Sequence, residues 1–307
     1  MNTATRTATE TRRLRTRAER MLAVERLTAP ATRANTARNA RAERDRHVRW
    51  APARDALWEF LDVHLADGVR MAILGAGNCD DLPLERIAGR ADAVTLVDLD
   101  GRATRGARRR LPRRLRGRID VVEHDVTGGA ADAIAIAAAT GQVPERVVVS
   151  EASLPGAPYD LAIGDLLYSQ LLYPALVDLN GPAARRSTFV ARYAPTLTRS
   201  VVARLHVSAP EGLMLHIHDP IAWWPGHSQP VTLARILAAS ATDPVAALAL
   251  TGLGSGPHHS DPRAALSSFA IPVRATAMWS WPFAPGVDYL ACATLAGSSS
   301  DQRCNER

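Results

Sequence analysis

Two glycines and a downstream acid are the residues of this chain whose spacing best suits ligand binding. Residues 69–74 form a short apolar run that leads directly into Gly75 and Gly77, and a second apolar run, residues 93–97, ends at Asp98. Glycines one residue apart let the backbone turn sharply and lie close to a ligand. A carboxylate at the end of the next parallel strand can accept hydrogen bonds from both hydroxyls of a ribose. The pattern therefore predicts a site for a nucleoside-bearing cofactor.

The residues after the second glycine discriminate between cofactors. In a dinucleotide site the N-terminus of a helix faces a pyrophosphate, and here that position holds Asp80 followed by Asp81. Two carboxylates on the first turn of a helix suit the helix dipole, but they would repel a diphosphate. They suit a ligand with a cationic group, such as the amino group or sulfonium of S-adenosylmethionine. The alternative is that both aspartates only cap the helix.

With these residues the sequence resembles the class I S-adenosylmethionine-dependent methyltransferases. Residues 74–82, Leu-Gly-Ala-Gly-Asn-Cys-Asp-Asp-Leu, are similar to the first motif of that family, in the variant of several bacterial proteins that read Gly-Asn-x-x-Asp-Leu. The resemblance continues through residues 97–100, 121–126 and 159–165, which correspond to the second, third and fourth strands. It covers about residues 65–295, and four motifs in the right order make it more specific than any one of them.

The resemblance implies a fold, a cofactor and a set of binding residues. The fold is of class α/β, a doubly wound, seven-stranded, mostly parallel, Rossmann-like sheet, and the cofactor is S-adenosyl-L-methionine. Ile73 and Cys79 stand where the family often has an acid and a third glycine, so Asp80 or Asp81 is a candidate to replace that acid. The implied cofactor-binding residues are Gly75, Ala76, Gly77, Asn78, Asp80, Asp81, Asp98, Leu99, Asp125, Val126, Asp165 and Leu166.

Three other residues are candidates for the chemistry of methyl transfer. The reaction is an in-line displacement, so the protein must place a nucleophile against the sulfonium carbon and remove a proton from it if it is a hydroxyl. His218, near the end of a predicted fifth strand over residues 212–220, is the first candidate for a general base, and His216 is the second. Tyr168 follows the fourth strand, where the resemblance implies that the methyl group lies. The alternative is that the strand histidines are core residues.

Charge is distributed unevenly along the 307 residues. All 37 basic residues are arginines; residues 1–50 carry 13 of them with five acids, and residues 102–118 carry nine with no acid. Such a cluster is typical of nucleic-acid binding, but it has no interleaved aromatic residues, so a solvated outer helix is the favoured interpretation. No stretch is apolar and long enough to span a membrane. Three cysteines without ligand spacing, Cys79, Cys292 and Cys304, favour a reduced cytoplasmic protein without a metal site.

Three parts are expected along the chain. Residues 1–64 form an arginine-rich helical extension that lies over the cleft as a lid, residues 65–296 form the methyltransferase domain, and residues 297–307 form a loose tail. Trp50 and Trp58 are candidate cover residues, although plain core positions are the alternative.

Periodicity and breakers predict the remaining elements. Residues 30–40 read as a linker or a poor helix, residues 146–150 as a candidate inserted strand, and residues 252–261 as a loop. Residues 221–227 are a candidate aromatic wall for the acceptor. Helices are expected over 11–27, 51–65, 81–90, 102–111, 131–140, 185–208 with an interruption or restart at Pro195, 233–239 and 244–250, and an antiparallel hairpin over 273–295.

The favoured function is methyl transfer from S-adenosylmethionine to an oxygen or nitrogen of a small molecule or peptide. The alternatives are an RNA methyltransferase, an NAD(P)-dependent reductase that shares the strand, glycine turn and acid, and a partner subunit that binds the cofactor without catalysis. The sequence selects neither an acceptor nor an oligomeric state.

Overall fold

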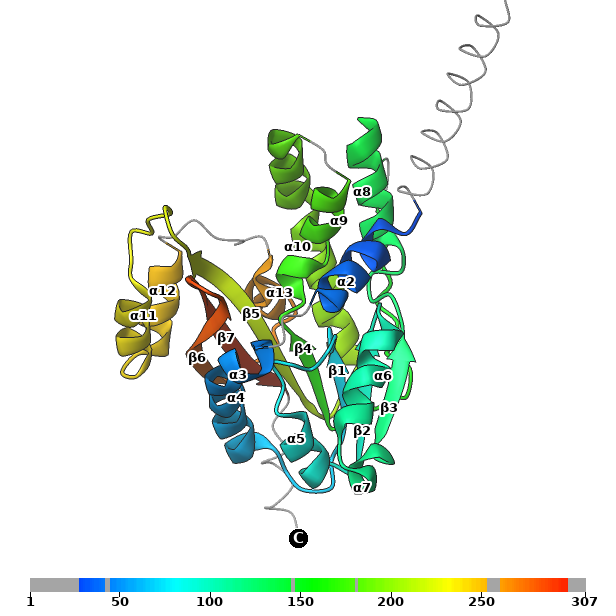
Figure 1. The fold of residues 1–307 in the computed structure, drawn as a ribbon, viewed down its shortest axis with the longest axis vertical. Helices are drawn as coiled ribbons and strands as arrows, with labels where there is room; N and C mark the ends of the chain where they lie inside the picture. The colour runs from blue at the N-terminus through cyan, green and yellow to red at the C-terminus, as the bar shows by residue number, and fades with distance from the viewer. Residues whose placement is uncertain (1–27, 42–44, 145–146, 180–181, 253–259, 298–307) are drawn as a thin grey trace, which may run out of the picture.

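The computed structural model describes residues 28–41, 45–144, 147–179, 182–252 and 260–297 (Figure 1). Within these residues seven strands form one sheet in the order β3-β2-β1-β4-β5-β7-β6. β7 runs antiparallel to both of its neighbours, and the other pairings are parallel. The predicted α/β fold with a seven-stranded, mostly parallel sheet is confirmed. The strands are β1 (Arg70–Leu74), β2 (Ala93–Asp98), β3 (Ile119–Glu123), β4 (Leu161–Asp165), β5 (Leu213–Trp223), β6 (Val273–Ala284) and β7 (Val287–Gly297).

The central strands are mostly apolar because both of their faces are covered. All residues of β4 are buried, as are all but the first residue of β1 and of β2. Continuous apolar runs of this kind are typical of parallel strands between two helical layers. β1 pairs with β2 on one side and with β4 on the other. The strand order therefore reverses at β1, because β2 and β3 lie on one side of it and β4 on the other. Such a switch point opens a crevice at the carboxyl ends of the strands.

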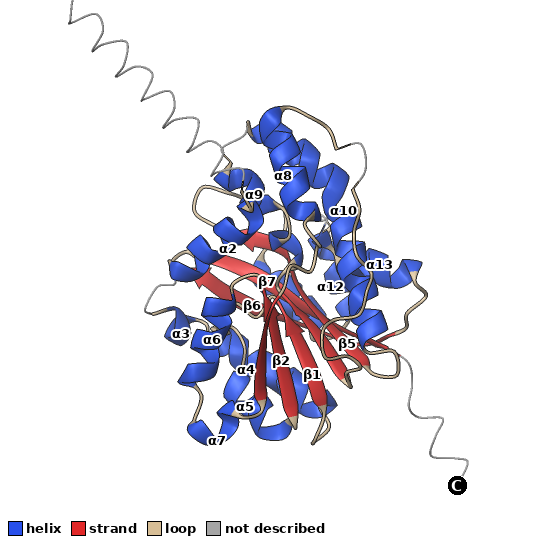
Figure 2. Cartoon of the chain, turned by 90° about the vertical axis from the view of Figure 1, so that its right-hand side faces the viewer, coloured by secondary structure: helices blue, strands red, loops and turns tan. Residues whose placement is uncertain are grey.

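Helices cover both faces of the sheet (Figure 2). One face packs against α4 (Ala51–His64), α5 (Leu84–Arg90), α6 (Gly101–Arg110) and α7 (Arg113–Arg116). The other face packs against α8 (Ala130–Thr140), α9 (Tyr173–Asp178), α10 (Ala183–Ser208) and α13 (Pro262–Ser268). The remaining elements are α2 (Pro30–Ala40), α3 (Arg46–Arg49), the 3₁₀ helix η1 (Tyr168–Gln170), and the pair α11 (Leu233–Ser240) and α12 (Pro244–Thr251), which contacts β6.

The predicted interruption at Pro195 is wrong, because α10 runs through this residue without a break. Pro195 itself is exposed. Its neighbours Tyr193, Leu197 and Val201 lie on the opposite, buried side of the helix. Packing of that apolar stripe compensates for the backbone hydrogen bond that proline cannot donate.

Other predicted elements differ from the structure in smaller ways. Residues 30–40 are a regular helix, α2, and α7 replaces an expected loop. Residues 147–150 form no strand. β6 continues to Ala284, so the hairpin turn is tighter than expected. The predicted helix over residues 11–27 and most of the predicted loop over 252–261 lie outside the described residues.

Among the residues described, no helix combines the length and the apolar character needed to cross a membrane.

Candidate functional site

A cavity of about 280 Å³ lies at the carboxyl ends of the parallel strands, where the loops after β1 and β4 diverge. The structure brings the whole predicted cofactor set to this cavity, because the members follow β1, β2, β3 and β4, whose ends lie at one edge of the sheet. The predicted residues that line it are Gly75, Ala76, Gly77, Asn78, Asp80, Asp81, Asp98, Leu99, Asp125, Val126, Asp165 and Leu166.

The turn after β1 depends on glycine. Gly75 and Gly77 have φ values of 78° and 47°, in the left-handed region that side chains disfavour. A Cβ atom at Gly75 would lie 2.8 Å from the carbonyl oxygen of Asp165 and 2.9 Å from Cβ of Leu167. The backbone N–H of Gly77 donates to Oδ2 of Asp98 at 2.9 Å. The turn is therefore joined directly to the acid that ends β2.

Asp98 is buried in the cavity wall, and both of its carboxylate oxygens accept hydrogen bonds. Besides the bond from Gly77 to Oδ2, its Oδ1 accepts from Nδ2 of Asn35 at 2.6 Å and from the backbone N–H of Asp100 at 2.8 Å. Burial raises the pKa of Asp98, and these hydrogen bonds act against the rise. Asp100 in turn accepts bonds from two N–H groups at the start of α6. This chain of bonds fixes the carboxylate at the mouth of the crevice.

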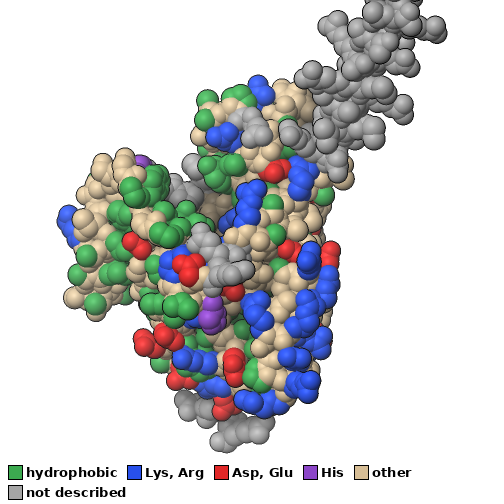
Figure 3. Space-filling model, in the orientation of Figure 1, with side chains coloured by type: hydrophobic (Ala, Val, Ile, Leu, Met, Phe, Trp, Pro, Cys, Tyr) green, Lys and Arg blue, Asp and Glu red, His purple; other side chains and the backbone are tan. Residues whose placement is uncertain are grey.

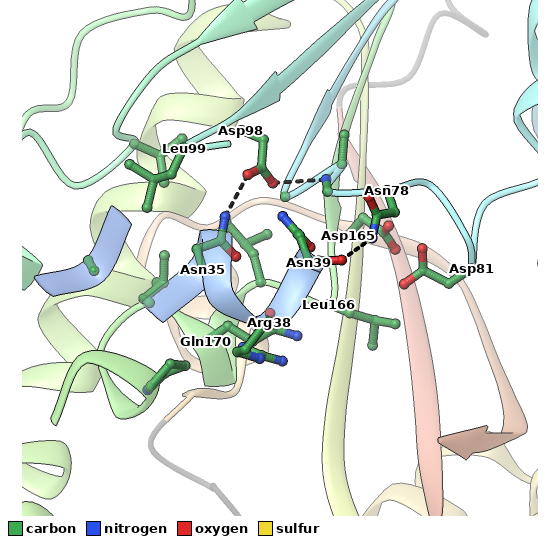
Figure 4. A pocket seen from close by; sticks show the side chains of 18 of the residues that line it. Asn35, Arg38, Asn39, Asn78, Asp81, Asp98, Leu99, Asp165, Leu166 and Gln170 are labelled. Atoms are coloured by element: carbon green, nitrogen blue, oxygen red, sulfur yellow. Dashed lines mark hydrogen bonds between the residues drawn. The ribbon is translucent and has the colours of Figure 1, made fainter. Parts of the chain in front are cut away.

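Helix α2 lies over the cavity, where the N-terminal extension was expected to lie, but none of its side chains is among the predicted cofactor residues. Asn35 points from α2 toward Asp98, as Figure 4 shows. Nδ2 of Asn39 donates to Oδ2 of Asp100 at 3.1 Å, and Nδ2 of Asn78 donates to the carbonyl oxygen of Asn39 at 3.0 Å. These contacts join residues about 40 to 60 positions apart. A polar helix with few buried side chains carries no local signal for such contacts.

The two aspartates after the glycine turn do not lie on a helix. α5 begins only at Leu84, after Pro83, so the predicted position on a first helical turn is wrong. Asp80 instead forms ion pairs with Arg46 at 3.6 Å and with Arg110 at 3.3 Å. The alternative role of capping the helix is therefore excluded for both aspartates.

Two more acids line the cavity wall, the half-buried Asp81 and the buried Asp165. Burial raises the pKa of Asp81 from 3.8 to about 6. Burial also raises the pKa of Asp165 well above its usual range, and the charges of Asp81 and Asp98 add to the rise. Oδ2 of Asp165 has no hydrogen-bond partner among the residues that the structure describes. Asp165 has an unpartnered carboxylate oxygen and is repelled by Asp81 and Asp98, which favours a cationic ligand at this place.

Asp125 lies at the opposite end of the cavity, after β3. Its Oδ1 accepts from the backbone N–H and the hydroxyl of Thr127 at 2.7 and 2.8 Å, and its Oδ2 accepts from the backbone N–H of Gly129 at 2.6 Å. The carboxylate thus shapes the turn that leads into α8. Asp125 and the following Val126 line the cavity beside this turn.

Tyr168, His216 and His218 are buried, and none of them is among the described residues that line the cavity. The Tyr168 hydroxyl is hydrogen-bonded to Nδ1 of His216. Nε2 of His218 lies 3.7 Å from Oδ1 of Asp261. Burial lowers the pKa of His216 to about 3 and that of His218 to about 4, so both imidazoles are neutral at physiological pH. The structure does not bring these three candidates to the cavity.

An aromatic wall lines the cavity, and its residues differ from those of the predicted wall. Trp50, Trp281 and Phe283 line the cavity, whereas Trp58 does not. The segment 221–227 is not among the described residues that line this cavity, so its role as an aromatic wall for the acceptor stays a prediction. Trp281 and Phe283 alternate on β6, and this period of two is a signal that the sequence already carries.

Comparison with known proteins shows a similarity in overall fold only. No family model matches the sequence, and a search of curated proteins found no match. A solved structure of a SAM-dependent methyltransferase from Aquifex aeolicus is similar at 10% identity and a TM-score of 0.41, covering 80% of this chain and 89% of that one. Magnesium protoporphyrin IX methyltransferase from Synechocystis PCC 6803, with bound SAH, is similar at 13% identity and a TM-score of 0.40, covering 81% and 83%.

Proposed function

We propose that this chain is a class I S-adenosylmethionine-dependent methyltransferase that transfers a methyl group to an oxygen or nitrogen of a small molecule or peptide. The observation that carries the proposal is the convergence of the predicted cofactor residues on one cavity at the switch point of the sheet. Cavities at this place are the usual ligand sites of doubly wound sheets.

The donor and acceptor groups of the cavity fit this cofactor. The Asp98 carboxylate beside the glycine turn suits the ribose hydroxyls. Asp81 and Asp165 suit the cationic amino and sulfonium groups, because a cation offsets the repulsion between neighbouring carboxylates. The end lined by Asp125 and Val126 is left for the adenine. When bound, the cofactor supplies a methyl group whose bond to sulfur breaks as the acceptor's lone pair forms the new bond.

The local structure disfavours the dinucleotide alternative. A pyrophosphate site needs the N-terminus of a helix directly after the glycine turn. Here α5 begins only at Leu84, and the intervening residues include Asp80 and Asp81. Neither a helix dipole nor a neutral backbone cradle is available to a diphosphate at this turn.

The arginines of α6 and α7 support a small acceptor over RNA. Basic side chains gather along this side of the molecule (Figure 3). Several of them donate to backbone carbonyl oxygens of the same region: Arg108 to Arg116, Arg116 to Leu111, and Arg118 to Ala91. These contacts hold the helix ends and the strand connections together, so the arginines have a role in the fold without a nucleic acid.

Titration calorimetry with S-adenosylhomocysteine and, separately, with NADH tests the proposal. We expect micromolar binding of S-adenosylhomocysteine and no heat from NADH. Binding of NADH alone would replace the methyltransferase by a reductase. Binding of S-adenosylhomocysteine without turnover of any acceptor would favour the partner subunit.

A further inference from the structure

Part of the cavity lies outside the residues assigned to the cofactor, and its chemistry indicates what else binds there. Trp50, Trp281 and Phe283 form one wall, and Arg38 of α2 also lines the cavity. Building on the proposed function, we propose that this part of the cavity binds a planar aromatic carboxylate as the methyl acceptor.

The aromatic wall consists of rings that are packed against one another. The ring centroid of Trp281 lies 5.0 Å from that of Trp50 and 5.2 Å from that of Phe283. Nε1 of Trp50 donates to the carbonyl oxygen of Phe283 at 3.1 Å, and the guanidinium of Arg46 lies 4.6 Å from the Trp50 ring centroid. The rings are therefore fixed before a ligand arrives. Such surfaces favour stacking or edge contacts with another flat ring.

Trp281 also leaves one polar group unsatisfied. Its Nε1–H is buried and has no acceptor in the part of the chain that the structure describes. An unpaired buried donor is costly, whereas the equivalent group of Trp50 is satisfied by a carbonyl oxygen. An oxygen acceptor that reached this donor on binding would offset that cost.

Arg38 supplies positive charge at the same end of the cavity. Its Nη1 donates to Oε1 of Gln170 at 2.9 Å, and it forms no ion pair with any described acid. Arg46, by contrast, is paired with Asp80. Burial raises the pKa of Tyr289, which packs on Phe283, and the charge of Arg38 acts against this rise. Arg38 and the three rings line the same cavity.

Arg38 adds positive charge to a cavity whose wall is rich in acids, and Asp219 and Asp98 are the acids whose charges act on it. The buried acids lie at the ends of β2 and β4, where the cofactor's cationic groups are expected, and Arg38 projects from α2 (Figure 4). A guanidinium with N–H groups to spare matches a carboxylate. An aromatic ring with a carboxylate satisfies the wall, the free indole donor and the arginine together.

The test measures binding to the protein saturated with S-adenosylhomocysteine. The probes are the three hydroxybenzoate isomers and anthranilate, each paired with its neutral amide and with the matching cyclohexanecarboxylate. We expect at least one aromatic carboxylate to bind about tenfold more tightly than both of its partners. Equal binding of the amide, or binding of none of the carboxylates, would overturn the inference.

Variants locate the contacts. Arg38→Gln should weaken the best carboxylate about tenfold and leave its amide unchanged, and Arg38→Lys should recover part of the loss. Trp281→Phe, which keeps a ring but removes the donor, should weaken binding several-fold. Arg33→Gln, on the same helix but paired with Asp178 at its surface, controls for disturbance of α2.

S-adenosylhomocysteine affinity separates two kinds of failure. If the wild-type protein binds it but no aromatic carboxylate, the acceptor class is wrong and the proposed function stands. If it does not bind, the proposed function fails and the acceptor inference fails with it. An unchanged affinity for S-adenosylhomocysteine in Arg38→Gln shows that a loss of carboxylate binding is local to the acceptor end.

Discussion

At the scale of single residues, Gly75 has the least freedom to change. Its positive φ and the nearby backbone of Asp165 leave no room for a Cβ atom, so the turn must carry glycine for the sheet ends to approach each other. The same turn holds Asp98 through Gly77. The motif thus has a role in stability as well as in binding.

Gly75→Ala should lower the free energy of unfolding by about 2 kcal/mol or more, because it combines a left-handed φ with a steric overlap. Gly89→Ala is the matched control: Gly89 lies in α5, and a Cβ atom there would meet nothing within 4 Å. That control should change stability by less than about 1 kcal/mol, in the stabilising direction. Urea unfolding midpoints measure both, and equal midpoints would contradict the strain argument.

Asp81 should make cofactor binding depend on pH. Its folded-state pKa of about 6 means that it is mostly protonated at pH 5 and mostly ionised at pH 7. A cationic ligand binds the ionised form, so affinity for S-adenosylmethionine should rise about tenfold over this interval. Asp81→Asn should flatten the profile, and the exposed control Asp120→Asn should retain it. A wild-type affinity that falls as the pH rises would contradict the prediction that the ionised form of Asp81 binds the cationic ligand.

At the scale of elements, α2 determines access to the cavity. It is attached mainly through polar groups, including the backbone N–H of Ala31 on Asp132 and the ion pair of Arg33 with Asp178. Asn35 occupies Oδ1 of Asp98, which the proposed function assigns to the ribose. The ligand and this helix therefore compete for the same carboxylate.

Asn35→Ala should tighten binding of S-adenosylhomocysteine about fivefold, because the competing hydrogen bond to a charged group is removed. Thr36→Ala, at an exposed neighbour on the same helix, should leave the affinity unchanged. Calorimetry distinguishes this from the opposite outcome: a tenfold loss in Asn35→Ala would mean that the asparagine itself holds the ligand.

Local sequence was sufficient to predict the elements that carry the cofactor set. β1, β2 and β4 are buried on both faces, so their apolar runs stand out, and the glycines and acids follow at strand ends. Helices such as α2 and α13 are held by contacts distant in sequence and carry weak periodicity. Whether the catalytic candidates reach the cavity depends on the direction of their side chains, which local sequence does not give. His216 shares a face of β5 with Met214, which packs in the core near α10, so neither lines the described cavity.

At the scale of the whole molecule, basic charge collects on one side while the cavity wall is rich in acids. The formal net charge is +6, and the arginines of α6 and α7 lie in the helical layer over one face of the sheet, where α6 contacts β2 and β3. A field of this kind attracts polyanions without sequence preference and is screened by salt.

At 25 mM NaCl a labelled single-stranded RNA should therefore bind only weakly. At 150 mM NaCl its binding should no longer be detectable. Fluorescence anisotropy over a salt series measures this. Submicromolar binding at 150 mM with a steep salt slope, flattened by replacing Arg108, Arg109 and Arg110 with glutamine, would support the RNA methyltransferase instead.

The central claim is that the carboxylate ending β2 binds the ribose of the cofactor beside the glycine turn, and one comparison tests it most directly. Calorimetry with S-adenosylhomocysteine is carried out on the wild-type protein, on Asp98→Ala and Asp98→Asn, and on the exposed control Asp120→Ala. Loss of two charge-assisted hydrogen bonds predicts at least a tenfold weaker affinity in both Asp98 variants and no change in the control. Wild-type affinity in an Asp98 variant that remains folded by thermal unfolding would contradict the claim.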